Sequence, residues 1–300
     1  MTLVTGTSAG TRDTEADLAR RPAGAATRLW QASPLTYLAL LIALALSVFP
    51  LWFMFVGASR TADQIAQSPP PLTPGGRFLH NWTVVFNNPD AKILTGLTNS
   101  LIISAVVTLT TVFFGSLAGF AFAKLRFRGK NALLLIILGT MMVPIQLGLI
   151  PLYLIMRDFG LIDNVWAVIL PFMLGGFAVF MMRQYAVQAV PDELIEAARV
   201  DGCSTARIYW NVVLPALRPA AAVLGLLTFM QTWNNFLWPL VVLPSNPTVQ
   251  ISLRSLSNGY YQDYSQVFAG TVVATIPLLL LFIVFGRQII GGIMEGAVKA

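Results

Sequence analysis

The sequence predicts an all-α integral membrane protein with six transmembrane helices. Hydrophobic residues make up 56% of the 300-residue chain and charged residues only 11%, whereas a soluble domain carries roughly 25% charged residues. Six stretches also lack Asp, Glu, Lys, Arg and His over a length that crosses a bilayer, which takes about 20 residues. They run approximately over 34–57, 98–123, 131–156, 164–182, 219–243 and 265–286.

Six crossings place both termini on one side of the membrane, and the basic residues indicate which side. Fourteen of the 19 Lys and Arg residues fall in the two tails and in segments 124–130 and 183–218. Because cytoplasmic loops carry an excess of Lys and Arg, both termini are predicted to be cytoplasmic. The net charge of +6 thus reflects topology, and its dispersal predicts no nucleic-acid surface.

Two domains follow from these patterns. Residues 1–33 are rich in Thr, Ala, Gly and charge, which predicts a disordered cytoplasmic tail. Residues 34–300 form the six-helix transmembrane domain. Within it, the segment 58–97 holds four prolines between residues 69 and 74 and predicts an irregular extracytoplasmic loop rather than a helix. The segment 183–218 is the only long polar segment on the cytoplasmic face.

Several classes of function are disfavoured by what the chain lacks. No predicted span carries an ionisable residue, which disfavours a carrier driven by an ion gradient. A single cysteine and a single histidine argue against a disulfide framework and a multi-histidine metal site. The chain also lacks the phosphate-binding pattern G-x-x-x-x-G-K-[ST]. We therefore predict no catalytic, cofactor or metal site, and uphill transport would need energy from another chain.

The loop 183–218 predicts two short helices joined by a glycine hinge. Pro191 suits the first helical position, where its missing N–H costs nothing, and the two acidic residues after it complement the helix dipole. Gly202 stands where a helix end needs a residue that tolerates positive φ. Ser204 is expected to cap the second helix, which is predicted to end at Pro215.

The same loop resembles the EAA motif of ATP-binding-cassette importer permeases. The motif is carried by Glu196-Ala197-Ala198, Gly202 and Leu214-Pro215 at the family's spacing, with Val212 in place of the usual Ile. The resemblance implies an importer type I permease fold whose coupling helix docks in a groove of an ATPase subunit. The implied coupling positions are Glu196, Ala197, Ala198, Asp201 and Gly202.

Two further segments narrow the resemblance to the maltose-type (MalG-like) carbohydrate permeases. Residues 119–130 (GFAFAKLRFRGK) and 233–240 (WNNFLWPL) are similar to the second and fifth spans of that branch, and the resemblance covers about residues 35–300. It implies a bacterial plasma-membrane (inner-membrane) importer, surrounded by lipid, with a second homologous permease, two copies of an ATP-binding subunit and an extracytoplasmic solute-binding protein. The implied substrate is a di- or oligosaccharide such as cellobiose, while a polyol or glycerophosphodiester stays open.

Uncharged polar side chains in the predicted spans suit a neutral sugar. Gln231, Asn234 and Asn235 form the densest polar cluster together with Trp233, whose ring offers a stacking surface to a sugar. Gln146 lies between two prolines that predict a kinked or broken third span. Two roles stay open for them: the wall of a substrate pathway, or hydrogen bonds between helices.

Two other classes of protein stay open beside the importer. A gradient-driven secondary sugar carrier would take up solute without ATP hydrolysis. A receptor or scaffold would have no conduit, and would be favoured if Gln231 and Asn234 were fully packed between helices.

Overall fold

The computed structural model describes residues 33–257 and 263–297, and within them it consists of helices, turns and loops without a β-strand. The predicted tail 1–33 lies outside the described residues except for Ser33. The chain forms two units, Met1–Phe53 and Met54–Ala300. Most of the first predicted span belongs to the first unit, as helix α3, Pro34–Ala58, which carries no charged residue and contains an 18-residue stretch with a mean hydropathy of 2.5.

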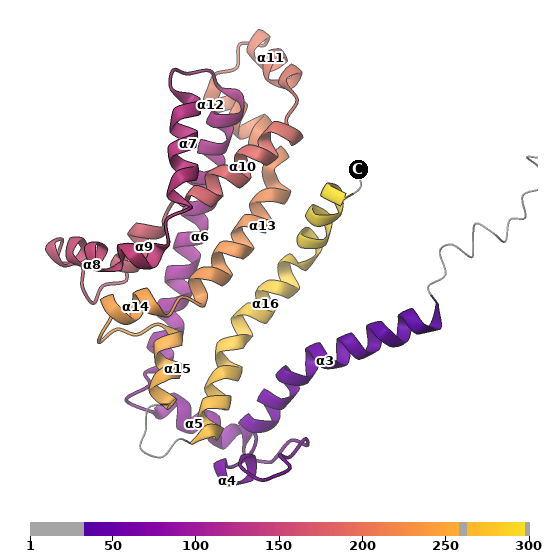
Figure 1. Ribbon diagram of the computed structural model, residues 1–300, viewed down its shortest axis with the longest axis vertical. Coiled ribbons are helices and arrows are strands. Elements are labelled where there is room, and N and C mark those ends of the chain that lie inside the picture. Colours follow the sequence, from indigo (N-terminus) through magenta and orange to yellow (C-terminus); the bar gives the residue numbers. More distant parts are fainter. Residues whose placement is uncertain (1–32, 258–262, 298–300) are drawn as a thin grey trace, which may run out of the picture. The chain divides into compact units, whose positions relative to one another are not determined.

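Four long helices form the framework of the second unit. Helix α6 packs against α10 and α13, and α13 packs against both α10 and α16 (Figure 1). These helices are α6, Ile93–Lys124; α10, Gly176–Ala189; α13, Leu214–Trp233; and α16, Tyr264–Ala297. Their close packing buries one apolar cluster near each end of the framework and a third beside α9 and α14.

Small residues let α6 and α10 approach closely. Gly115 and Gly119 are four residues apart on α6, the small-residue spacing that is common where membrane helices touch. A Cβ atom added at Gly119 would lie 2.7 Å from the Cβ of Met182 and 2.8 Å from the backbone nitrogen of Arg183. The two backbones are therefore in contact at this point.

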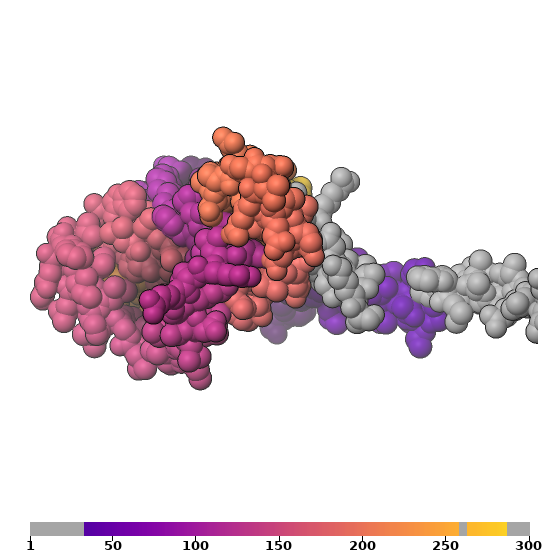
Figure 2. All heavy atoms as spheres, turned by 90° about the horizontal axis from the view of Figure 1, so that it is seen from above, coloured from indigo at the N-terminus to yellow at the C-terminus, as the bar shows by residue number. Residues whose placement is uncertain are grey.

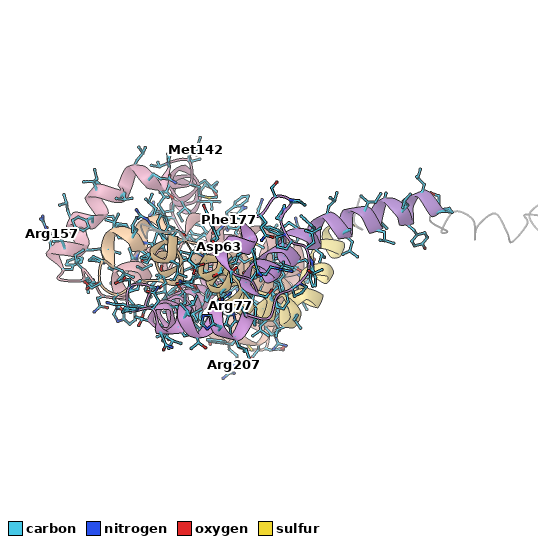
Figure 3. All side chains as sticks on the ribbon, turned by 90° about the horizontal axis from the view of Figure 1, so that it is seen from below. Asp63, Arg77, Met142, Arg157, Phe177 and Arg207 are labelled. Carbon is cyan, nitrogen blue, oxygen red and sulfur yellow. The ribbon has the colours of Figure 1, made fainter. Side chains whose placement is uncertain are left out.

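The third and fourth predicted spans are both broken. Helix α7, Lys130–Thr140, is bent by 88° from the segment Ile145–Asp158, with the break at residues 141–144, which end in Pro144. That segment consists of a short 3-10 helix η1, Ile145–Gly148, and helix α8, Leu149–Asp158. Helices α9, Trp166–Phe172, and α10 are bent by 41°. Figure 3 shows Met142 and Arg157 at the outer edge of the α7–α8 arm. The break predicted from the prolines of the third span is confirmed.

The fifth predicted span, 219–243, is placed wrongly. Helix α13 already ends at Trp233, and α14, Leu237–Val242, begins only after a three-residue break. A further helix that the sequence did not suggest, α15, Val249–Ser257, packs on α6 and α16. The length of an unbroken apolar stretch indicates how many residues lie in or near the membrane, but it does not indicate where a helix ends or changes direction.

The predicted end of the second loop helix at Pro215 is also wrong. Helix α12, Thr205–Ile208, continues through a π-helical turn η2, Tyr209–Val213, directly into α13. Proline lacks an N–H and its ring clashes with the preceding turn, so it normally ends a helix. Here Pro215 occupies the first turn of α13, where that N–H is not needed, and the wider π turn precedes it.

The connection 58–97 is more helical than its prolines predicted. It contains α4, Ala62–Ile65, and α5, Phe78–Asn87, and α6 begins at Ile93. Residues 59–61, 66–77 and 88–92 of this connection lie outside the helices. Helix α5 is stabilised because it packs on α16, and Val85 is fully buried there. The side-chain amide of Asn81 donates to the carbonyls of Ala58 and Arg60, both at 2.9 Å.

The second unit has two distinct ends. Helix α11, Asp192–Val200, and α12 lie at one end with the α6–α7 connection, while α4 and α5 lie at the other (Figure 1). Figure 2 looks onto the α11 end and shows the α11–α12 segment beside the start of α7. Eight Lys and Arg residues belong to segments 124–130 and 183–218 at or near the α11 end.

Candidate functional site

A polar cavity lies beside α13, between α6 and the two broken helices. It consists of two adjoining hollows of about 510 Å³ and about 320 Å³, which share Ile145, Phe172, Gln231 and Asn235. The polar residues of the larger hollow are Thr111, Thr140, Thr228, Gln231, Thr232 and Asn235, and those of the smaller are Gln146, Gln231, Asn234 and Asn235. We call the two hollows together the polar cavity.

The chemistry of the polar cavity is that of uncharged hydrogen-bonding groups. Hydroxyls and amides line it, and no ionisable side chain does so among the described residues. Between them lie the apolar surfaces of Phe172, Phe177 and Phe236. Such a wall can donate hydrogen bonds to the hydroxyl groups of a solute and accept hydrogen bonds from them. Its apolar surfaces can cover the C–H groups of the same solute.

The structure brings four of the five predicted pathway residues into the wall of the polar cavity. Gln146, Gln231 and Asn235 make no side-chain hydrogen bond to the described part of the chain, so their amides are available. Asn234 is different, because its side chain donates to the carbonyl of Met230 at 2.9 Å and lies 3.3 Å from the amide of Gln250.

The fifth residue, Trp233, does not have the predicted placement. Its side chain is only 1% exposed, and its ring stacks on Phe229 with 5.7 Å between ring centroids. The expectation that Trp233 offers a stacking surface to a sugar is therefore wrong. It ends α13 in the core, because an aromatic ring gains more from burial than an amide does.

Sequence reasoning missed the threonines of the polar cavity. Thr228, Gln231 and Thr232 of α13 are spaced at i, i+3 and i+4, and Asn235 follows two residues after the helix ends. On a helix this spacing places the first three side chains on one face. The periodicity of polar residues within α13 was thus a signal for the cavity wall. Thr111 on α6 had no such signal, since its position depends on the packing of α9.

The predicted hinge at the end of α11 is confirmed in detail. Gly202 has φ +75°, and the N–H groups of Gly202 and Cys203 donate to the carbonyls of Arg199 and Ala198 at 3.0 and 2.9 Å. This pair of bonds is the Schellman motif, which ends a helix at a residue with positive φ. Ser204 caps α12 by accepting from the N–H of Arg207, as predicted. Pro191 differs slightly, since it precedes the first helical residue.

Most of α11 is exposed. Ile195 is the one residue of the helix that is buried, at 4% exposure. Of the predicted coupling positions, Glu196, Ala197, Asp201 and Gly202 are exposed, and Ala198 is half-buried. Val200 is 89% exposed, which leaves an apolar side chain on the surface next to these positions.

A charged groove of about 640 Å³ separates α11 from the end of α6. Across it, the Nζ of Lys124 lies 2.7 Å from Oδ1 of Asp192. The hydrogen bond and the charge of Lys124 hold the pKa of Asp192 below its ordinary value of 3.8, and the charges of Arg126 and Lys130 act in the same direction. Asp192 is consequently ionised at neutral pH.

Comparison with known families gives a match over the region that contains the polar cavity and α11. A family described as the binding-protein-dependent transport system inner membrane component matches residues 111–289. The arabinooligosaccharides transport system permease protein AraQ of Halalkalibacterium halodurans is 36% identical over 258 residues, which cover 85% of this chain and 92% of AraQ. The lactose transport system permease protein LacG of Rhizobium radiobacter is 37% identical over 265 residues, covering 88% of this chain and 95% of LacG.

More distant relatives share the same extent. The sn-glycerol-3-phosphate transport system permease protein UgpE of Yersinia pestis is 29% identical and covers 86% of this chain and 95% of UgpE. Among solved structures, a bacterial ABC transporter involved in the import of the acidic polysaccharide alginate has a chain with TM-score 0.71 at 22% identity. That match covers 94% of this chain and 99% of the other, so the two share a fold.

Proposed function

This chain belongs to the family of binding-protein-dependent transport system inner membrane components, and from that membership we propose that it forms half of the translocation pathway of an ATP-driven importer. It is a transport permease subunit rather than an enzyme. The observation that carries the proposal is the polar cavity, whose wall offers amides and hydroxyls without an ionisable side chain among the described residues.

The substrate that we propose is a neutral di- or oligosaccharide delivered by a binding protein. A phosphorylated or acidic solute entering a membrane domain needs cationic partners, because an unpaired charge in such surroundings is costly. Free amides at Gln146, Gln231 and Asn235 instead suit sugar hydroxyls. Relatives named for arabinooligosaccharides and for lactose support this substrate class.

We further propose six membrane spans with the α11 end in the cytoplasm. The spans are α3, α6, α7 with α8, α9 with α10, α12 with α13, and α16; four of these are single helices long enough to cross, and the other two are the bent pairs. The basic residues gathered near α11 support the orientation, because cytoplasmic loops carry the excess of Lys and Arg. Both termini are then cytoplasmic, with the domain 34–300 following the tail 1–33 and the segment 58–97 outside.

Helix α11 is proposed as the docking element for the ATPase subunit, in the loop 183–218. Its exposed face combines small Ala197 with Val200 and the carboxylate of Glu196, and Gly202 fixes its end. A small residue lets a partner surface approach the backbone, and a fully exposed valine gains free energy when it is covered. One such helix on this chain and one on a second, homologous permease would engage two ATPase copies.

The test is a native purification from mild detergent, followed by mass spectrometry of the proteins that accompany the chain. We expect a P-loop ATPase, a second permease and a solute-binding protein. Glu196→Lys and Gly202→Asp should lose the ATPase while the chain stays in the membrane. Asp63→Lys is the matched control, because it makes a similar change of charge on exposed α4 at the opposite end of the second unit.

Uptake measurements separate the importer from the remaining alternatives. Purified complexes in liposomes should accumulate a labelled neutral oligosaccharide only with ATP and binding protein. Uptake by the chain alone without nucleotide would instead support a gradient-driven carrier. A receptor without a conduit is not favoured, since Gln231 and Asn234 are exposed beside a cavity rather than packed between helices.

A further inference from the structure

An ion pair joins α11 to the end of α6. Lys124 is the last residue of α6 and Asp192 the first of α11, and their charged groups lie 2.7 Å apart. The lysine side chain is only 7% exposed, whereas that of Asp192 is 76% exposed. The other ion pair in the described part of the chain joins the sequence neighbours Arg157 and Asp158. Lys124 therefore makes the one described ion pair between separate helices.

The other cations of the charged groove form no described ion pair with α11. Lys130 donates to the carbonyls of Ala123 and Leu125 at 3.3 and 3.0 Å, which caps the end of α6. Arg126 and Arg199 line the groove, and their guanidinium groups make no hydrogen bond to the described residues. A buried ammonium group without a partner would raise the free energy of the folded state, so the ion pair of Lys124 with Asp192 is favoured.

The same helix that ends at Lys124 also forms the wall of the polar cavity. Val107 and Thr111 on α6 line the larger hollow. The Thr111 hydroxyl is within 3.1 and 3.3 Å of the carbonyls of Phe172 and Met173, at the break between α9 and α10. Thr111 and Lys124 are about 20 Å apart along one unbroken helix, at 1.5 Å per residue. A displacement of Lys124 along the axis of α6 would therefore also move the residues of α6 that line the polar cavity.

On its N-terminal side, α11 is joined to the framework by a short covalent junction. Helix α10 ends at Ala189, and α11 begins at Asp192. The two residues between them, Val190 and Pro191, are extended, with φ/ψ of −118°/100° and −59°/144°. A short non-helical junction can pivot without moving α10. The ion pair bypasses that junction.

We propose that Lys124 is a positioning residue for energy coupling: its ion pair with Asp192 makes α6, and with it the wall of the polar cavity, follow the movement of α11. This inference rests on the proposed docking of the ATPase on α11. It assigns the coupling movement a further path, through α6, beside the covalent paths through α10 and through α12 into α13.

The experiment follows the polar cavity by chemical modification while nucleotide is bound. Asn235→Cys is introduced together with Cys203→Ser, which removes the one native cysteine. The complex with its copurified ATPase is then treated with a maleimide, with and without ATP and vanadate. We expect a nucleotide-dependent change in modification rate of about fivefold or more in the parent, as for typical coupling between sites.

Lys124→Gln and Asp192→Asn should each weaken this nucleotide response, because the path through α6 is lost while the covalent paths remain, and they should leave the amount of copurified ATPase unchanged. The exchange of charges, Lys124→Asp with Asp192→Lys, should restore it. Arg126→Gln is the matched control, since it removes a cation of the same groove that forms no described ion pair, and it should respond like the parent.

The outcomes separate this inference from the function on which it rests. If no ATPase accompanies the parent chain, the proposed function fails and the inference fails with it. If the ATPase is present and Lys124→Gln keeps the full response, only the role of Lys124 is overturned. A response that is reduced in Lys124→Gln but not restored by the charge exchange also overturns it, because loss of the ion pair would then not explain the reduction.

Discussion

The hydroxyl oxygens of Ser116 and Tyr209 lie 2.6 Å apart in the core between α6 and the π-helical turn η2. Both residues are buried, with exposures of 0% and 2%. Ser116 also lies 2.9 Å from the carbonyl of Phe113, to which it donates its single hydrogen. Tyr209 must therefore donate to Ser116. This bond fixes the point at which the segment after α11 joins α13.

The direction of that bond predicts an asymmetry between two substitutions. Ser116→Ala leaves the Tyr209 hydroxyl buried without an acceptor, which should cost about 1–3 kcal/mol in the free energy of unfolding. Tyr209→Phe removes the donor and leaves Ser116 bonded to Phe113, so it should cost about 1 kcal/mol. Thermal unfolding in detergent compares the two variants. An equal or reversed order would show that the bond does not run this way.

The contact between α6 and α10 predicts the effect of adding one methyl group. At Gly119 an alanine Cβ would press on the backbone of α10 at 2.8 Å, so Gly119→Ala should destabilise the protein by about 1–3 kcal/mol. Gly139→Ala is the control, because Gly139 lies within α7 and has no atom within 4 Å of the added carbon. That variant should be neutral or slightly stabilised, since alanine favours a helix. Similar unfolding temperatures for both variants would contradict the close approach.

At Gly202 the constraint is the backbone rather than space. The φ of +75° is unfavourable for residues with a Cβ by about 1–2 kcal/mol, although no atom lies within 4 Å of the site. Gly202→Ala should therefore loosen the end of α11, whereas Gly202→Asn should do so less because asparagine tolerates this region. Hydrogen exchange of the Gly202 and Cys203 amides measures the effect. Equal protection in both variants would argue against a backbone cause.

Local rules predicted what depends on neighbouring residues. The glycine stop and the serine cap around α11 follow from the chemistry of one or two side chains, and both are confirmed. The broken third span followed from Pro144 in the same way. These signals predict local geometry directly, because proline fixes its own φ and glycine is the residue that adopts positive φ without a steric cost.

The predictions that were wrong concern features that depend on packing between distant segments of the chain. Pro215 does not end its helix, and Trp233 turns into the core rather than the cavity. Lys124 and Asp192 are 68 residues apart, and no local pattern linked them. Hydropathy measures how apolar a stretch is, while the partner that each side chain meets is set by the tertiary fold.

The low pKa of Asp192 predicts how stability responds to acid. The charge of Lys124 lowers this pKa below 3.8, so the ion pair stabilises the folded state at higher pH and is lost as pH falls through the lowered pKa. The unfolding temperature of Asp192→Asn should thus lie below that of the parent through neutral and mildly acidic pH. The difference should close only below pH 3.8. A difference that vanishes well above that value would place the pKa of Asp192 too high for this ion pair.

The two adjacent amides at the end of α13 predict opposite consequences for transport. Asn235 has a free side chain in both hollows of the polar cavity, whereas Asn234 is bonded to Met230 and lies against Gln250. If the cavity binds sugar hydroxyls, Asn235→Ala removes a hydrogen bond of about 0.5–1.5 kcal/mol, which raises the half-saturation concentration for uptake by about 2- to 10-fold. Asn234→Ala should change that concentration little and lower the unfolding temperature instead, because it breaks hydrogen bonds within the chain.

Uptake of labelled neutral di- and trisaccharides over a range of concentrations, with unfolding measured on the same preparations, compares the two variants. A larger loss of uptake affinity in Asn234→Ala than in Asn235→Ala would mean that the free amide does not face the solute, and the polar cavity would then be a packing feature rather than a pathway.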